Sequence, residues 1–550
     1  MRMTRTFAVL SLAGALAAAG THANAAGLTP VPNAQPKVVG NSAPNVLSPE
    51  LAEKIVAQGS NPLENGTVDF PFYGYNGDGT MLPAPGDVQS ATHNVEATKT
   101  EPDKNTYLVL PGLGGPDSHY DYGKRFLFQG HELGKGFITR INLDADYAHR
   151  VTLLASTDIH GNPLPVFDGS TWYPFSLRLL FSAENSTTGG VWQATPSHAS
   201  VVERLTGAFG HASYEGMQAD PHGNIWVVED AGGPFGTANP HARQPNSFLF
   251  RFIPKDKTDL TKGGKLQALQ VISMAHAGPI VFHTGQADAD ITSQDQKDLH
   301  KYGNVFDINW VTIHDTGVDG VADFDANDLA KKAGATPFKR PENGQFRPGS
   351  GFREFFFDTT GDTSAATEAG AFGGFGAIFK LSQSSSSADH GKLTLFFLGD
   401  IDHTGLDNCA FWSDHEIVFV EDRGDGLHKD HNAFDSAFLF DTRVNYGNPA
   451  NHPVRILALG RDASATIDSG LSGSKGFQNE GDNEITGIHI SDGDPGVFGL
   501  LGAKIPNPFH DGWRVFYTQQ HGDNQTWEII PAKQSRHHGH DDDDDDDDRR

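Results

Sequence analysis

Cysteine is almost absent from this sequence of 550 residues, which contains only Cys409. The chain therefore cannot form a disulfide with itself, and a metal site built from several cysteine thiolates is excluded. A lone cysteine within an apolar run is most often a small buried hydrophobic residue. We expect Cys409 to take that place on a strand.

Long apolar runs are also missing after the first 25 residues, so no membrane-spanning helix is expected in the rest of the chain. The first 25 residues have the three parts of a secretory signal: basic Arg2 and Arg5, an apolar run over 7–20, and Ala-Asn-Ala at 23–25. We expect cleavage after Ala25 and a secreted or periplasmic protein. Because the two arginines are not adjacent, the twin-arginine export route is not indicated.

Positive charge is scarce. Lys and Arg number 41 against 69 Asp and Glu, so the formal net charge is −28. Such a chain repels the phosphate backbone, which excludes nucleic acid as a partner, and it attracts divalent cations. The tail over 533–550 is rich in His and Asp, and the mutual repulsion of its aspartates predicts a disordered segment. We expect a monomer.

What the chain has in abundance is a short repeat. An apolar strand runs into a small cluster of acids, amides or histidine, then turns into a second apolar strand. A unit of this kind cannot bury its own faces, so repetition implies stacking or circular closure. We predict an all-β fold, a six-bladed β-propeller over 105–532. The six copies span 125–141, 177–194, 223–254, 352–383, 415–443 and 513–530.

Two further segments complete the predicted organisation. A leader and loop-rich segment over 26–104 precedes the propeller, with one short helical turn expected at 48–58. The longest spacer between copies, 255–335, reads as an insertion on one face of the propeller. Amphipathic patterns within it predict helices over 293–303 and 325–334.

Acids at equivalent places in separate copies are the strongest chemical signal. Glu215, Glu342, Asp407 and Glu484 each stand at the start of an apolar strand that precedes a repeat. If these strands line the axis, the carboxylates converge, and they repel one another unless a cation neutralises them. Ca²⁺ takes six to eight oxygen ligands, often from distant segments. We therefore predict a calcium site; the alternative is that each acid separately caps a loop.

A second set of candidates follows the repeat strands. His131 with Glu132, and Glu184, are candidates for catalysis and for metal ligation. Neighbouring residues on a strand point to opposite faces, so at most one member of a pair such as Glu229 and Asp230 can face the axis. A lone histidine such as His131 is more often structural.

Arg340 lies two residues before Glu342 and would share its strand face. A guanidinium beside a metal carboxylate can hold a substrate oxyanion through two hydrogen bonds, although a simple ion pair with an acid is the alternative. The sequence has no G-x-S-x-G, no P-loop and no H-E-x-x-H. Metal-activated water therefore fits better than a serine or cysteine nucleophile.

Six segments, in order, resemble the PhoX family of secreted alkaline phosphatases, which are six-bladed β-propellers with iron and calcium cofactors. The resemblance implies metal ligation by Glu215, Glu342 and Glu484, with Asp407 as a further ligand, and phosphate contact by Arg340. The segments are FLFQGHEL (126–133), LLFSAEN (179–185), YEGMQADPHGNIWVVEDAGG (214–233), GATPFKRPENGQF (334–346), LDNCAFWSDHEIVFVED (406–422) and NEITGIHISDGDP (483–495).

The chain also departs from that family. Ala183 stands where the family has its iron-binding cysteine, and Asn185 replaces a second glutamate. Together with the missing twin-arginine signal, these changes predict a member that binds calcium without the iron pair.

Three functions remain open. The first is a calcium-dependent phosphoric-ester hydrolase acting on small phosphoesters, in which Arg340 stabilises charge on the phosphoryl group. The second is a calcium-dependent propeller of the lactonase type, which would polarise an ester carbonyl. The third is a non-catalytic, calcium-stabilised propeller that binds polymers or proteins. Removal of Arg340 should abolish phosphatase activity, yet leave a lactonase able to bind its metal.

Overall fold

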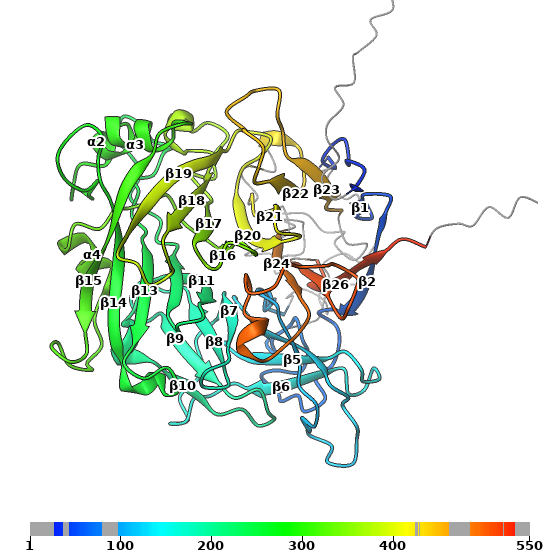
Figure 1. Ribbon diagram of the computed structural model, residues 1–550. Helices are drawn as coiled ribbons and strands as arrows, with labels where there is room; N and C mark the ends of the chain where they lie inside the picture. The colour runs from blue at the N-terminus through cyan, green and yellow to red at the C-terminus, as the bar shows by residue number, and fades with distance from the viewer. Residues whose placement is uncertain are drawn as a thin grey trace, which may run out of the picture.

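A computed structural model describes residues 27–36, 43–79, 97–423, 427, 430–460, 484–520 and 522–533. The predicted signal segment lies outside the described residues, and so does all of the predicted tail except Lys533. The fold is all-β and propeller-like, with sheets arranged around a central axis (Figure 1). No helix within the described ranges is long and apolar enough to cross a membrane.

Four sheets are separate antiparallel meanders. Their strands, in spatial order, are β3 (Thr106–Val109), β4 (Arg125–Gly130), β5 (Ile138–Asn142) and β6 (Val151–Ala155); β7 (Ser170–Tyr173), β8 (Arg178–Ala183), β9 (Gly190–Ala194) and β10 (Val202–Arg204); β20 (Leu406–Phe411), β21 (Glu416–Glu421), β22 (Ser436–Asp441), β23 (Val454–Ala458) and β1 (Val46–Leu47); and β24 (Ile485–Ser491), β25 (Arg514–Gln519), β26 (Gln525–Pro531) and β2 (Leu51–Ala57).

The remaining sheet has nine strands and contains two meanders. Strand β15 pairs with β14 on one side and with β19 on the other, and so joins them. The predicted six separate blades are therefore not confirmed, because the described residues form five sheets. The order is β11 (Tyr214–Ala219), β12 (Ile225–Glu229), β13 (Leu249–Pro254), β14 (Gly264–Val271), β15 (Phe306–Asp315), β19 (His390–Leu398), β18 (Ala377–Gln383), β17 (Glu354–Thr359) and β16 (Gly344–Phe346).

Each predicted repeat forms the second and third strands of a meander. These strands are largely apolar and mostly buried because both of their faces are covered by neighbouring sheets. All six residues of β21, for example, are buried. Cys409 is buried among aromatic side chains of the cluster that includes Phe356 and Phe419, which confirms its predicted role as a small hydrophobic residue.

The first strands of the meanders line the axis. Contacts run from β3 to β7, β11, β16, β20, β24 and back to β3. Figure 1 shows β7, β11, β16, β20 and β24 grouped around the centre. Residues at the start of these strands are therefore brought together at one end of the axis.

The N-terminal segment closes the ring. The predicted helical turn at 48–58 is wrong, because Leu51–Ala57 forms strand β2, which pairs with β26 and completes the last sheet. Local helix propensity is overridden here by an unpaired sheet edge, which offers a row of backbone hydrogen bonds. Part of the predicted leader therefore belongs to the fold.

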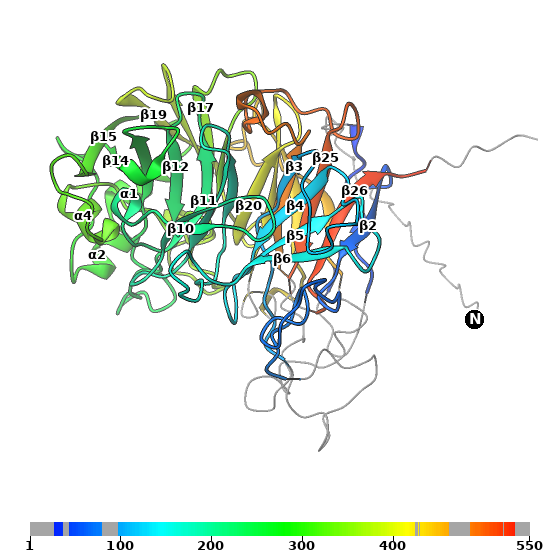
Figure 2. The ribbon, with the colours of Figure 1, turned by 90° about the horizontal axis from the view of Figure 1, so that it is seen from below.

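The predicted insertion over 255–335 is only partly an insertion. It begins with β14, the fourth strand of a meander, and it contains β15. Its helices α3 (Gln294–Leu299) and α4 (Ala326–Lys332) confirm the two predicted ones, and α2 (Ala287–Ile291) precedes them. Figures 1 and 2 place α2 and α4 on the outer side of the molecule, away from the axis, and α4 contacts β15.

Candidate metal centre

Every first strand contributes one acid to the end of the axis. Each acid lies within the first two residues of the strand or up to three residues before it. Five of the six are buried, and Glu484 is half-buried. The six are Asp103, Asp168, Glu215, Glu342, Asp407 and Glu484.

The ends of the second strands add four more acids: Glu132, Glu184, Asp230 and Asp422 follow β4, β8, β12 and β21. We call these four and the six first-strand acids the axial carboxylate cluster. The other two second strands end in neutral donors that serve the cluster. Thr360 donates to Glu342 at 2.6 Å, and Gln520 donates to Glu132 at 2.9 Å.

The expectation that only one residue of each acid pair faces the axis holds for the pair at the end of β12. Asp230 belongs to the cluster, whereas Glu229 accepts hydrogen bonds from the Asn327 side chain at 3.0 Å and from the Phe248 backbone at 3.1 Å. The reason is the alternation of side chains along a strand.

Three groups within the cluster are close enough to share a cation. In each group, one ligand atom from every member lies within 4.8 Å of the others. Asp168 and Glu215 each belong to two groups, so they could bridge neighbouring cations. The groups are Asp103 with Glu132 and Asp168, Asp168 with Glu184 and Glu215, and Glu215 with Asp230 and Glu342.

The donor set fits a metal ion. Asp168 Oδ1 is buried and, among the described residues, has no hydrogen-bond partner, which would be costly without a cation. The cluster offers only oxygen donors, the ligands that hard cations prefer. No cysteine or histidine belongs to any of the three groups found in the described ranges.

The electrostatics of the cluster point the same way. Burial, followed by the charge of Asp230, raises the pKa of Glu184 to about 8. Burial and the neighbouring Asp168 and Glu342 raise the pKa of Glu215 well above its usual range. Carboxylates so arranged ionise only when a positive charge compensates them, so cation binding would displace protons.

Arg340 stands at the edge of the cluster. Its Nε and Nη2 donate to Asp230 at 2.7–2.9 Å, and Nη2 lies 3.5 Å from Glu342. Burial alone would lower the pKa of Arg340, but Asp230 and Glu342 outweigh it and raise that pKa. Its φ of 56° is unusual for a residue other than glycine, and such strain concentrates at functional sites.

A buried lysine supports two other acids of the cluster through Asn408. Lys104 Nζ donates to Asn408 Oδ1 at 2.7 Å, and Asn408 Nδ2 donates to both oxygens of Asp407 at 2.8 Å. Asn408 Nδ2 also donates to Thr486 at 3.0 Å, and the Thr486 hydroxyl donates to Asp103. One ammonium thus orients two first-strand acids through a single amide.

The structure brings together Arg340 and six of the acids predicted as ligands. His131 does not join them. It is fully buried, its ring nitrogens face the hydroxyls of Thr100 and Thr139 at 2.8 and 2.9 Å, and it stacks on Phe137. The acids that the structure gathers from the predicted set are Glu132, Glu184, Glu215, Glu342, Asp407 and Glu484.

Sequence reasoning missed Asp103, Asp168, Lys104 and Asn408. The two aspartates precede strands that were not recognised as the first strands of repeats, because those strands have only four residues each. The distance of each aspartate from the repeat that follows it could have identified both as members of the set. Lys104 and Asn408 act through contacts across the axis, which leave no local pattern.

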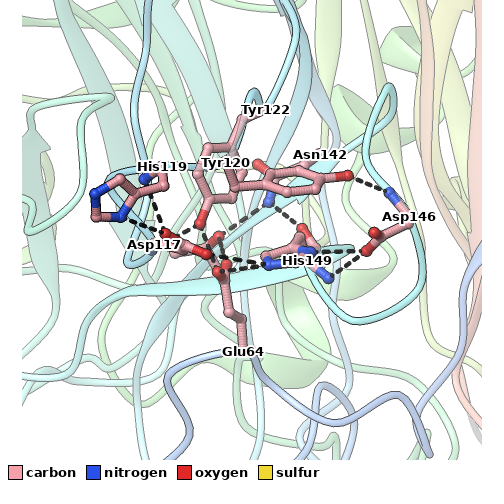
Figure 3. A network of polar contacts seen from close by, with 9 residues as sticks. Glu64, Asp117, His119, Tyr120, Tyr122, Asn142, Asp146 and His149 are labelled. Atoms are coloured by element: carbon pink, nitrogen blue, oxygen red, sulfur yellow. Dashed lines mark hydrogen bonds and ion pairs between the residues drawn. The ribbon is translucent and has the colours of Figure 1, made fainter.

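A second polar network lies apart from this cluster, around the turn between β5 and β6 (Figure 3). His149 Nδ1 lies 2.8 Å from Asp146, and its ring stacks on Tyr120 with centroids 3.6 Å apart. Its Nε2 lies 3.8 Å from Glu64 and 3.9 Å from Asp117.

Comparison with known proteins gives one family match. Residues 239–429 match the family model described as alkaline phosphatase PhoX, and this segment contains Arg340, Glu342, Asp407 and Asp422. No curated protein matches the chain.

Solved structures share low identity with the chain. PhoX from Pseudomonas fluorescens in complex with vanadate, a transition state analogue, has a TM-score of 0.49 and 12% identity, covering 92% of this chain and 98% of its own. The α-L-arabinofuranosidase PaAbf62A from Podospora anserina has a TM-score of 0.31 and 9% identity, covering 69% and 95%. TolB from Acinetobacter baumannii has a TM-score of 0.28 and 8% identity, covering 78% and 64%.

Proposed function

We propose that this chain, a member of the PhoX type of alkaline phosphatases, is a metal-dependent enzyme. It hydrolyses small phosphoric monoesters at the axial carboxylate cluster. One observation carries the proposal. The segment that matches the family places Arg340 and Glu342 beside Asp230 at the edge of a buried group of carboxylates.

The residues of the chain divide the work. The three carboxylate groups would hold the cations, with Asp168 and Glu215 as bridging ligands. Bound divalent cations supply Lewis acidity and lower the pKa of a bound water. Arg340 uses Nε and Nη2 for Asp230, which leaves the Nη1 hydrogens for an equatorial oxygen of the phosphoryl group.

Calcium is the cation we propose, and iron is not part of the proposal. The cluster has oxygen donors only, and Ala183 at the end of β8 provides no thiolate beside Glu184. We further propose that the six first strands act as a six-bladed propeller and that the protein is exported by the signal over 1–25, as a monomer. The count of one acid from each first strand supports the sixfold arrangement.

The test combines elemental analysis of the purified full chain with hydrolysis of p-nitrophenyl phosphate, with and without added Ca²⁺. We expect stoichiometric calcium and calcium-dependent turnover that falls at least about a hundredfold in Arg340→Gln. Arg347→Gln is the matched control, because Arg347 has the same side-chain exposure of 21% and pairs with Glu354 outside the cluster.

Other outcomes would redirect the assignment. Bound calcium without phosphatase activity would move it to a lactonase-type enzyme or to a non-catalytic binding propeller, and activity toward carboxylic esters would separate those two. Stoichiometric iron would contradict the inference drawn from Ala183.

A further inference from the structure

The hairpin loop between β12 and β13 begins directly after Asp230, a member of the axial cluster. Phe235 and Arg243 face each other across it as a β-bridge, supported by hydrogen bonds from Gly236 N to Ala242 O at 3.0 Å and from Gln244 N to Pro234 O at 2.9 Å. The loop is therefore a defined structure and holds its two facing side chains at the border of the cluster.

The backbone of Arg243 is anchored to the segments that carry other site residues. Its N–H donates to Asp362 Oδ1 at 2.9 Å. Asp362 also accepts a hydrogen bond of 2.8 Å from Lys339 Nζ, and Lys339 directly precedes Arg340 in the chain. Asp362 itself lies two residues after Thr360. Arg243 is thus fixed relative to Arg340 and to Thr360, which donates a hydrogen bond to Glu342.

The guanidinium of Arg243 has no acid of its own. Within the described ranges it forms no ion pair, its Nε is buried without an acceptor, and Nη1 reaches only the Gly233 carbonyl at 3.4 Å. Its Cζ lies 4.1 Å from the centre of the Phe235 ring, in cation–π geometry. A half-buried cation of this kind has unused donors.

The positive charges of Arg243 and Arg340 lie near enough to repel each other. Burial lowers the pKa of Arg243, and the charge of Arg340 lowers it further, while Asp230 opposes the change. Asp230 is already engaged by two nitrogens of Arg340. An anion bound between the two guanidinium groups would relieve their repulsion and use the free donors of Arg243.

Gly232 leaves space beside the Arg243 guanidinium for a bound anion. A Cβ at this position would lie 3.3 Å from Arg243 Nη1, tighter than ordinary van der Waals contact. The absence of a side chain therefore keeps the nearby part of the guanidinium uncovered. Phe235, with 48% of its surface exposed, supplies an apolar face next to it.

We propose that Arg243 and Phe235 form a substrate subsite at the rim of the cluster, which binds phosphoric monoesters with an aromatic or other apolar leaving group. Arg243 takes a phosphoryl oxygen opposite Arg340, and the Phe235 ring covers the organic part of the ester. The inference rests on the proposed phosphatase function and adds its substrate class.

The first test uses Arg243→Met in the full, calcium-loaded chain. We expect binding of inorganic phosphate, measured by calorimetry, to weaken about ten- to a hundredfold, with a matching rise in KM for p-nitrophenyl phosphate. Metal content should not change. Arg455→Met is the control, because Arg455 also lies over an aromatic ring, Phe438, but on the outer strand β23.

The second test uses Phe235→Ala, which keeps the charge. We expect KM to rise about three- to tenfold for p-nitrophenyl phosphate and to stay unchanged for methyl phosphate. Equal changes for both esters would overturn the role of Phe235. If Arg243→Met fails to fold, Arg243→Lys replaces it, because lysine keeps the charge but loses the planar fork.

The outcomes separate the two proposals. Unchanged phosphate binding and KM in Arg243→Met would overturn the subsite while leaving the phosphatase function standing. Phosphate binding that depends on Arg243 in a protein without turnover would uphold the subsite and contradict the phosphatase function. A wild-type chain that neither binds phosphate nor hydrolyses esters would overturn both.

Discussion

At the scale of single residues, the axial cluster depends on neutral and cationic side chains as much as on its acids. Asn408 receives one hydrogen bond from Lys104 and donates to Asp407 and Thr486, so its amide can adopt only one orientation. Groups that orient metal ligands typically change metal affinity by about 10- to 100-fold when removed. Asn408 is such a positioning residue.

The corresponding prediction concerns Asn408→Leu. We expect calcium affinity, measured by calorimetry, to fall about tenfold because Asp407 loses its donor and Lys104 loses its acceptor. Asn142→Leu is the control. Asn142 is likewise a buried, hydrogen-bonded amide, but it lies on β5 beside Arg140, and its loss should lower stability while leaving calcium affinity unchanged. Equal affinity losses in both variants would show a general effect of misfolding instead.

At the scale of elements, the turn between β5 and β6 carries a titratable contact (Figure 3). The hydrogen bond to Asp146 is the main cause that raises the pKa of His149, with Glu64 and Asp117 adding to it. A histidine whose pKa is higher in the folded state stabilises the fold below its unfolded pKa of about 6.5. That contribution is lost as pH rises through the folded value.

We therefore predict that His149→Gln lowers the melting temperature at pH 5.5 and has little effect at pH 8.5. The measurement is thermal unfolding of the variant and the parent at both values. His160→Gln, the same substitution at an exposed turn, is the matched control. An effect that grew toward alkaline pH would contradict the assignment, because neutral histidine loses the charge attraction to the surrounding carboxylates.

At the scale of the whole molecule, ten carboxylates from distant parts of the chain meet at one end of the axis, where Arg340 pairs with Asp230 and Lys104 binds the amide that holds Asp407. The raised pKa of Glu184, from 4.5 to about 8, means that the metal-free folded state binds protons more tightly than the unfolded state. Glu184 therefore does not weaken the metal-free fold at low pH, but it destabilises that fold increasingly as pH rises from about 4.5 to 8.

Removal of metal should expose this dependence. We predict that a chelator lowers the melting temperature more at pH 8 than at pH 5.5, since ionised acids need the cation and protonated acids do not. Added Ca²⁺ at about 100 times its Kd should restore about 2.7 kcal/mol for each site. A chelator effect that is the same at both pH values would contradict a metal centre built from these acids.

The repeats, six of the ten cluster acids and Arg340 could all be predicted from the sequence. Apolar strands bounded by turns are local signals, so all six predicted copies became the second and third strands of meanders. Glu215, Glu342, Asp407 and Glu484 could be found because each has a fixed distance to a strand. The buried role of Cys409 followed from its apolar neighbours.

The way in which distant segments meet could not be predicted from local sequence patterns. Strand β2 exists because β26 offers it an edge, and β15 joins two meanders because β14 and β19 lie on either side. Arg340 pairs with Asp230, which lies 110 residues away in the sequence. The ring nitrogens of His131 contact the hydroxyl groups of two threonines and no acid of the cluster. These contacts join segments that are far apart in the sequence, so no local pattern predicts them. Backbone groups at a strand edge and buried charged groups need a partner, and the closed ring determines which partner is near enough to bind.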